Sequence, residues 1–238
     1  MNYQRLKKDI ADIMRTPLND NGIYYIHDET NFLKGYALIC GPSDTPYEYG
    51  FYFFKILFPT NYPISPPKLT FCNYDNSNNT RFNPNLYRNG KVCISILNTW
   101  RGEGWTSCLT LKTVLLSVQT ILNKNPLINE PNISIEHQSV IPYNIIICYK
   151  NLYVSVGDTI QQLINNEGND IYLMFKPTII KIFLEKYDNI IKHVNRQHNS
   201  EVDNTTQIVN MYNMVCNINY GKLLDYIKKI KIELEKYN

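Results

Sequence analysis

Hydrophobic and polar positions in the first third of the chain predict one helix followed by four strands. Residues 4–15 place Leu6, Ile10 and Ile13 on one helical face and charged residues on the others. Runs rich in Tyr, Phe and Ile, separated by turn residues, then predict strands at Gly22–Asp28, Tyr36–Cys40, Phe51–Phe58 and Lys68–Cys72. Because the connections between them are short, we expect an antiparallel meander.

The next part of the chain is irregular until a second clear helix begins. Asn73–Gly90 is polar and lacks periodicity, and such a stretch inside a domain is usually functional or disordered. An apolar run, Val92–Leu97, and a loop bounded by two tryptophans follow. Thr110 is then the expected N-cap of a helix whose apolar residues recur at helical spacing up to Leu122.

The second half of the chain has mainly helical spacing. The pattern predicts helices over about 144–165, 171–195 and 207–236. Gln197–Thr206 is polar and is predicted to be a linker. The last predicted helix has an apolar stripe, and its lysines lie mostly off that stripe, which favours a docked amphipathic helix with a solvated basic face.

Composition and charge narrow the class of protein. The 238 residues are 44% hydrophobic, which supports a core, and the net charge of +3 is too small to indicate nucleic acid or an anionic membrane as partner. We see neither an apolar run of the ~20 residues that a spanning helix needs nor a secretion signal. The six cysteines are scattered, so we expect free thiols, no metal site, and a reducing cytoplasmic or nuclear location.

The segment RFNPNLYRNGKVCISIL, residues 81–97, carries the candidate chemistry. Cys93 follows Asn85 by eight residues on a loop rich in turn residues. Such a cysteine can form a thioester, and an amide N–H can stabilise the oxyanion of the tetrahedral intermediate. The alternative is that Cys93 begins a buried strand and that the asparagines only form turns. Taken alone, this segment favours that alternative over the catalytic one. Nothing in the sequence marks a histidine as its partner, although the sequence leaves a Cys–His pair open.

Four ordered motifs together resemble one family. They are FPTNYPISPPKLTF (58–71), the 81–97 segment, the tryptophan loop and LTLKTVLLSVQTIL (109–122), and they resemble the core of ubiquitin-conjugating enzymes over roughly residues 3–165. The resemblance implies an α+β ubiquitin-conjugating (UBC) fold, a four-stranded antiparallel meander with flanking helices. Residues 1–165 would form the core domain and 166–238 a helical C-terminal extension. The implied activity needs no cofactor: the enzyme accepts ubiquitin, or a ubiquitin-like modifier, as a thioester from an activating enzyme and transfers it to a substrate lysine or a ligase.

The resemblance also implies roles for individual residues. Cys93 would carry the thioester and would have to be reachable from solvent, and Asn85, the last residue of the family's His-Pro-Asn motif, would stabilise the oxyanion or hold its loop. The motif's first residue is Asn83 here instead of His, a change shared with one subgroup of the family. Glu130 matches the acidic gate position near the active cysteine. Tyr87 falls beside the site, where it could pack on the alkyl chain of the incoming lysine.

Two surfaces would meet the partner proteins of such an enzyme. The basic first helix resembles the surface presented to the activating enzyme, although an ordinary solvated helix face explains the same residues: Arg5, Lys7 and Lys8. Ligase contact is expected at two loops whose residues depart from the family's pattern: Ile64 in one, and Thr106, Ser107 and Cys108 in the other.

Two other functional classes compete with the enzyme as explanations of this sequence. A non-catalytic family variant that scaffolds an assembly is disfavoured because Cys93, Asn85 and Glu130 all keep their register. A basic nucleic-acid module built on the C-terminal helix is disfavoured by the low net charge. We therefore expect neither nucleic acid nor a membrane as partner.

Overall fold

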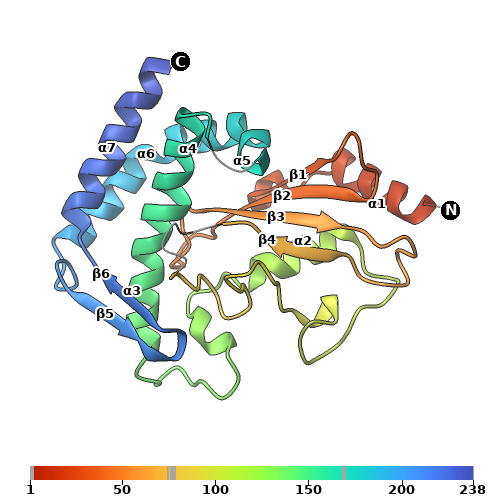
Figure 1. Cartoon of the computed structure of the whole chain (residues 1–238), viewed down its shortest axis with the longest axis horizontal. Helices are drawn as coiled ribbons and strands as arrows, with labels where there is room; N and C mark the ends of the chain where they lie inside the picture. Colours follow the sequence, from red (N-terminus) through yellow and green to blue (C-terminus); the bar gives the residue numbers. More distant parts are fainter. Residues whose placement is uncertain (1–2, 74, 76–78, 168–169, 238) are drawn as a thin grey trace.

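The computed structural model describes residues 3–73, 75, 79–167 and 170–237, and its centre is a four-stranded antiparallel sheet in the order β1-β2-β3-β4 (Figure 1). The strands are β1 (Ile23–His27), β2 (Lys34–Cys40), β3 (Phe51–Leu57) and β4 (Lys68–Phe71). Each strand pairs with the next one along the chain. The predicted meander is therefore confirmed.

Helices flank the sheet and make up most of the second half. They are α1 (Gln4–Arg15), α2 (Leu111–Thr120), α3 (Val140–Lys150), α4 (Thr159–Ile164), α5 (Asp170–Met174), α6 (Lys176–His198) and α7 (Tyr220–Tyr237). The side chain of Thr110 accepts a hydrogen bond from the Thr113 N–H, so the predicted N-cap of α2 is confirmed. None of the helices within the described residues is both long and apolar enough to cross a membrane.

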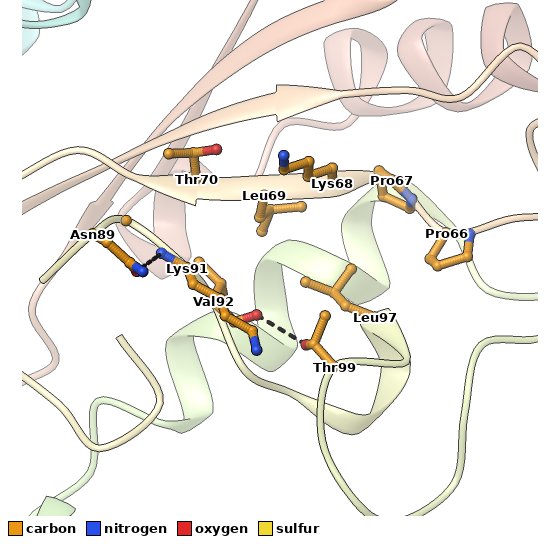
Figure 2. A pocket seen from close by; sticks show the side chains of 11 residues that line it. Pro66, Pro67, Lys68, Leu69, Thr70, Asn89, Lys91, Val92, Leu97 and Thr99 are labelled. Atoms are coloured by element: carbon orange, nitrogen blue, oxygen red, sulfur yellow. Dashed lines mark hydrogen bonds between the residues drawn. The ribbon is translucent and has the colours of Figure 1, made fainter. Parts of the chain in front are cut away.

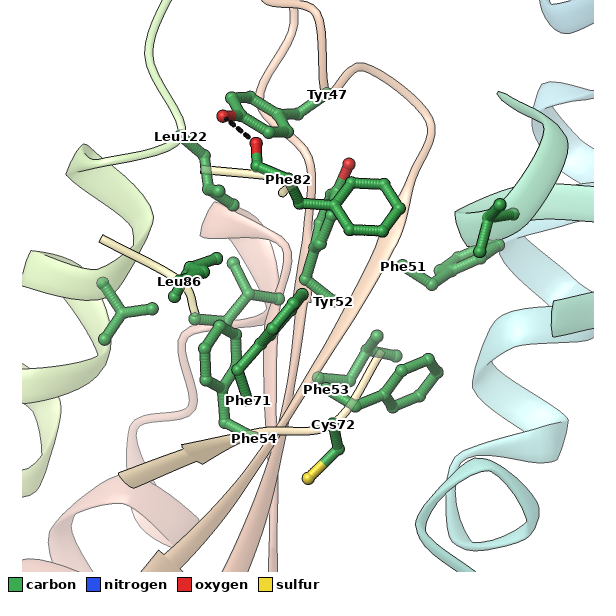
Figure 3. Close-up of a cluster of buried hydrophobic side chains, with 14 of the residues drawn as sticks. Tyr47, Phe51, Tyr52, Phe53, Phe54, Phe71, Cys72, Phe82, Leu86 and Leu122 are labelled. Carbon is green, nitrogen blue, oxygen red and sulfur yellow. Dashed lines mark hydrogen bonds between the residues drawn. The ribbon is translucent and has the colours of Figure 1, made fainter. Parts of the chain in front are cut away.

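Strand β3 is buried on both faces, which explains its unbroken aromatic sequence. Phe51, Tyr52, Phe53 and Phe54 are each at most 1% exposed. Since successive residues of a strand point to opposite faces, both faces of the sheet must be covered. Figure 3 shows Tyr52 and Phe54 on the side of α2, and Phe51 and Phe53 toward the C-terminal helices. Phe53 packs on Tyr172 of α5 with 4.2 Å between ring centroids, so the residues after 165 complete the core on that face.

The helix predicted over 207–236 is wrong up to residue 219. Residues 206–217 form a β-hairpin of β5 (Thr206–Val209) and β6 (Met214–Asn217), and α7 begins only at Tyr220. The hairpin side chains alternate between buried and exposed, which is the period of a strand. A 3-10 turn at Asn210–Tyr212 joins its strands, and Asn213 ends the turn with a φ of 50°.

Three further segments differ in detail from their predictions. The helix expected from about residue 144 begins at Val140 and continues through a π-helical segment, Asn151–Asp158, into α4. The expected linker is shorter, since α6 extends to His198. The apolar run Val92–Leu97 contains a single bridge to Leu86 and a 3-10 turn at Ser95–Leu97, so the strand that the alternative reading began at Cys93 does not form.

Asn73–Gly90 is irregular as predicted, although its residues 74 and 76–78 lie outside the described part of the chain. The division at residue 165 stays a prediction.

Candidate functional site

Asn85 and Cys93 are held together by two hydrogen bonds. The backbone N–H of Cys93 donates to the Asn85 carbonyl oxygen at 2.8 Å, and Asn85 Nδ2 donates to the Cys93 carbonyl oxygen at 2.7 Å. Asn85 is 5% exposed, and its Oδ1 has no hydrogen-bond partner among the described residues. The amide group carries a second N–H, which is not needed for the bond to Cys93. The structure therefore brings the predicted pair together.

Asn83, the residue at the motif's His position, stabilises this loop through hydrogen bonds of its side chain. Its Oδ1 accepts from the Asn85 N–H at 2.9 Å. Its Nδ2 lies 2.8 Å from both Tyr47 Oη and the Ile121 carbonyl oxygen. Tyr47 is itself fixed, because its hydroxyl donates to the Phe82 carbonyl at 2.7 Å. Asn83 is fully buried with both ends of its amide bonded, so the exchange of His for Asn preserves a structural support.

The thiol of Cys93 is covered in this structure. Cys93 is 1% exposed, so the expectation of a solvent-reachable sulfur is wrong for the state described. Its neighbours Val92 and Ile94 belong to the hydrophobic core cluster. Thr99 fixes this segment, with its Oγ1 2.9 Å from the Val92 carbonyl oxygen and 3.0 Å from the Ile94 nitrogen. Cys93 thus lies between two buried residues, in a segment fixed by Thr99.

Two pockets adjoin the segment that carries Cys93. One, of about 590 Å³, lies between the start of β4 and the turn before Cys93; Figure 2 shows Lys68 and Leu69 on one side and Lys91 and Val92 on the other. The second, of about 610 Å³, is lined by Asn98–Arg101 and by Pro131 and Asn132. Thr99 lines both pockets, and it is hydrogen-bonded to the residues on either side of Cys93.

Glu130 is the neighbour in sequence of a residue that lines the second pocket. It is half-buried and directly precedes Pro131, which lines that pocket together with Thr99. Its Oε2 accepts a hydrogen bond of 2.5 Å from the hydroxyl of Tyr212, in the turn between β5 and β6. The sequence analysis missed Tyr212, because a contact over 82 residues leaves no local signal.

Tyr87 contacts a cation of its own loop. The guanidinium carbon of Arg81 lies 3.7 Å from the centroid of the Tyr87 ring. Arg81 also donates to the carbonyl oxygens of Asn83 and Pro84, at 3.1 and 2.6 Å. Tyr87 therefore helps to hold the loop, and its contact with an incoming lysine stays a prediction.

The cysteine–histidine pair that the structure forms is a different one. Cys148 Sγ lies 3.6 Å from His193 Nε2. Burial raises the pKa of Cys148 to about 11, and burial, with a smaller contribution from Arg196, lowers the pKa of His193. Both groups are therefore neutral at pH 7, which is unlike the thiolate–imidazolium pair of a cysteine protease.

The residues assigned to partner binding lie on linked loops. Trp105 Nε1 donates to the Pro63 carbonyl at 2.7 Å and so joins the loop of Ile64 to the loop of Thr106–Cys108. Ile64 is 75% exposed, and Thr106–Cys108 are exposed. Arg5 is not a simple surface residue, since it donates to the carbonyls of Ser107 and Leu109, each at 2.7 Å.

The basic face of α1 is otherwise solvated. Lys7 and Lys8 are exposed, while Arg5 is half-buried and also pairs with Asp9 at 2.9 Å. Arg5 thus connects α1 to the Thr106–Cys108 loop, and its contact with an activating enzyme stays a prediction.

Comparison with known proteins places these observations in one family. The family model described as ubiquitin-conjugating enzyme matches residues 5–140. The chain is 45% identical over 135 residues to ubiquitin-conjugating enzyme E2 Z of Xenopus tropicalis, covering 57% of this chain and 42% of the relative. It is 41% identical over 159 residues to ubiquitin-conjugating enzyme E2 Z of Homo sapiens, covering 66% of this chain and 44% of the relative. A solved E2 domain of a Toxoplasma gondii ubiquitin conjugating enzyme aligns with a TM-score of 0.48 and 28% identity, over 63% of this chain and 94% of that one.

The chain belongs to the ubiquitin-conjugating enzyme family. The motif-based resemblance, which pointed within the family to enzyme Z, is confirmed by these relatives. The chain spans less than half the length of both E2 Z relatives.

Proposed function

We propose that this chain accepts ubiquitin or a ubiquitin-like modifier as a thioester on Cys93 and transfers it to a substrate lysine or to a ligase. The observation that carries the proposal is the pair of hydrogen bonds between Asn85 and Cys93, in a chain of this family. These bonds fix a side-chain amide next to the backbone of the cysteine, and transfer of an acyl group between thiols requires such a positioned donor.

The reaction proceeds in two acyl transfers. The Cys93 thiolate attacks the carbonyl of the modifier's thioester on the activating enzyme, and the activating enzyme's thiolate leaves. In the second transfer a neutral lysine amine attacks the new thioester, its proton goes to water, and the Cys93 thiolate leaves. The second N–H of Asn85 stabilises the oxyanion in both steps.

Lysine must first lose a proton, since its ordinary pKa is ~10.4. In this proposal Glu130, which precedes the pocket residue Pro131, orients the amine, and Tyr87 packs on the alkyl chain of the lysine. Desolvation in the pocket favours the neutral amine, and orientation then brings it to the thioester carbonyl.

The partner surfaces follow from exposure and charge. The activating enzyme meets the face of α1 that presents Lys7 and Lys8, with Arg5 fixing the loop behind them. A ligase contacts Ile64 and the adjoining Thr106–Cys108 loop. The free cysteines fit a reducing compartment, the cytoplasm or nucleus.

The covered thiol adds a requirement to this proposal. Because Cys93 is 1% exposed, charging needs a displacement that opens the sulfur to the modifier's C-terminal tail. The pocket of Asn98–Arg101 and Pro131–Asn132 adjoins that segment and has room for an extended tail. The same burial favours a second candidate function, a non-catalytic scaffold, and one experiment separates the two.

The test is a non-reducing gel after incubation with a panel of activating enzymes, modifiers and ATP. We expect a thiol-sensitive adduct in the wild type, a thiol-resistant oxyester in Cys93→Ser, and a wild-type pattern in Cys108→Ser, whose residue is exposed. A thiol-sensitive band that survives in Cys93→Ser excludes Cys93 as the carrier. If no modifier charges the wild type, the scaffold is the correct function.

A further inference from the structure

We propose that Tyr212 of the C-terminal hairpin is a positioning residue of the lysine-transfer site, acting through Glu130 and the loop of Asn85. This inference rests on the proposed function and extends the site to a part of the chain that the family match, residues 5–140, does not include. It is carried by three contacts of this one side chain and its backbone.

The first contact fixes the gate residue. Tyr212 Oη donates to Glu130 Oε2 at 2.5 Å, which is the short distance of a hydrogen bond to a charged acceptor. Burial, followed by the neighbouring Glu130, raises the pKa of Tyr212, so the hydroxyl stays protonated and remains a donor. One oxygen of the Glu130 carboxylate is thereby held, and the other is left to meet an incoming amine.

The second and third contacts fix the loop that ends at Cys93. The guanidinium carbon of Arg81 lies 5.2 Å from the centroid of the Tyr212 ring, and Arg81 donates to the backbone of Asn83 and Pro84. The carbonyl oxygen of Tyr212 accepts from Arg88 at 2.6 Å. A single residue of the extension thus contacts the gate and both arginines of the active-site loop.

Packing holds Tyr212 in this place. The ring of Tyr143 in α3 lies 5.9 Å from that of Tyr212, and the Tyr143 hydroxyl donates to the Arg81 carbonyl at 2.7 Å. The hairpin is also bonded to the loop at a second point, where Asn79 Nδ2 donates to the Val215 carbonyl at 3.4 Å. The hairpin therefore presents the hydroxyl from a docked element, as a positioning group requires.

Tyr212→Phe isolates the hydroxyl, because the ring on Arg81 and the carbonyl toward Arg88 remain. We expect single-turnover discharge of the thioester to free lysine to slow by about tenfold, since a misplaced carboxylate orients the amine poorly. Charging by the activating enzyme should slow by much less. Because both residues act through one carboxylate, Tyr212→Phe should slow discharge little further when added to Glu130→Ala.

Tyr226→Phe is the matched control. Tyr226 in α7 is also a half-buried tyrosine that donates to a carboxylate, that of Asp158, at 2.8 Å. Both variants lose one such bond and should lose comparable Tm, but Tyr226→Phe should discharge lysine at the wild-type rate. If the wild type charges and transfers but the two variants discharge at equal rates, the role of Tyr212 is overturned and the proposed function stands. A wild type that forms no thioester overturns the proposed function and this inference together.

Discussion

The peptide groups of Asn85 and Cys93 lie side by side, joined by one backbone hydrogen bond and one from the Asn85 side chain, of 2.8 and 2.7 Å. The seven residues between them therefore form a closed loop. Any movement of the amide moves the cysteine with it, so the two groups act as one unit.

Asn85→Ala should slow transfer to lysine more than it slows charging. The substitution removes an oxyanion donor, a loss that typically reduces the rate about a hundredfold. It also leaves the Cys93 carbonyl oxygen without its donor, which costs about 1–3 kcal/mol of stability where that group is buried. Single-turnover discharge and thermal unfolding measure the two effects separately.

Asn85→Asp is the comparison for that experiment. Aspartate keeps the size of the side chain but cannot donate when ionised, so it should discharge as slowly as the alanine variant. Lysine transfer at the wild-type rate in either variant would contradict the role given to Asn85.

Gly90→Ala should destabilise the loop before Cys93. Gly90 has a φ of +84°, and a Cβ there would lie 2.8 Å from Thr70 Cγ2 and 3.0 Å from the Phe71 carbonyl oxygen. We expect a loss of about 1–3 kcal/mol in the free energy of unfolding, measured by denaturant titration. Gly221→Ala, in α7 and facing the exposed His198, is the control and should change stability by much less.

The elements predicted correctly are those whose burial follows from local pattern. Strands β1–β4 and helix α2 are separated from one another by turn residues, and even the four-residue β4 follows the Pro66–Pro67 turn, so pattern and connections define them. The hairpin of β5 and β6 was missed because its strands have four residues each and adjoin a true helix. Two such short strands give too few positions for the period of two to be distinguished from a helical one.

In the candidate site, too, contacts within one loop were predicted and contacts made by tertiary packing were not. Asn85 and Cys93 are tied by contacts within one loop, and motif spacing predicted both. Tyr212 reaches Glu130 only when the hairpin docks, a contact set by tertiary packing. The burial of Cys93, by contrast, is what the local apolar run favours, and only the family resemblance implied a sulfur reachable from solvent.

The alkylation rates of the cysteines should show which thiols are slow because they are covered and which are slow because they are not ionised. Cys108 is exposed and should be alkylated first by iodoacetamide at pH 8, whereas Cys93 is covered and should react slowly. Cys148 is half-buried, but burial raises its pKa to about 11, so only about one thiol in a thousand is ionised at pH 8. Its rate should rise about tenfold for each pH unit. Peptide mass spectrometry gives the order, and alkylation of Cys93 as fast as Cys108 would contradict the covered state.

Asp158 should make the protein less stable at neutral pH than its amide variant. Burial raises the pKa of Asp158, so its contribution is fully present below the pKa of the unfolded chain and is lost as the pH rises through the folded-state pKa. Asp158→Asn still accepts the hydrogen bond from Tyr226 but carries no charge to desolvate. We therefore expect Asp158→Asn to raise Tm at pH 7 and to change it little at pH 3.

Glu233, on the same helix as Tyr226, has a lowered pKa, so Glu233→Gln should change stability with pH in the opposite direction to Asp158→Asn. A hydrogen bond from Gln161 is the largest of the effects that lower the pKa of Glu233, so its stabilisation is present above the unfolded-state pKa and is lost as the pH falls. Glu233→Gln should therefore lower Tm at pH 7 and leave it unchanged at pH 3. Thermal unfolding of the wild type and both variants at the two pH values measures these differences. An equal gain for Asp158→Asn at both values would show that its effect comes from packing and not from the charge.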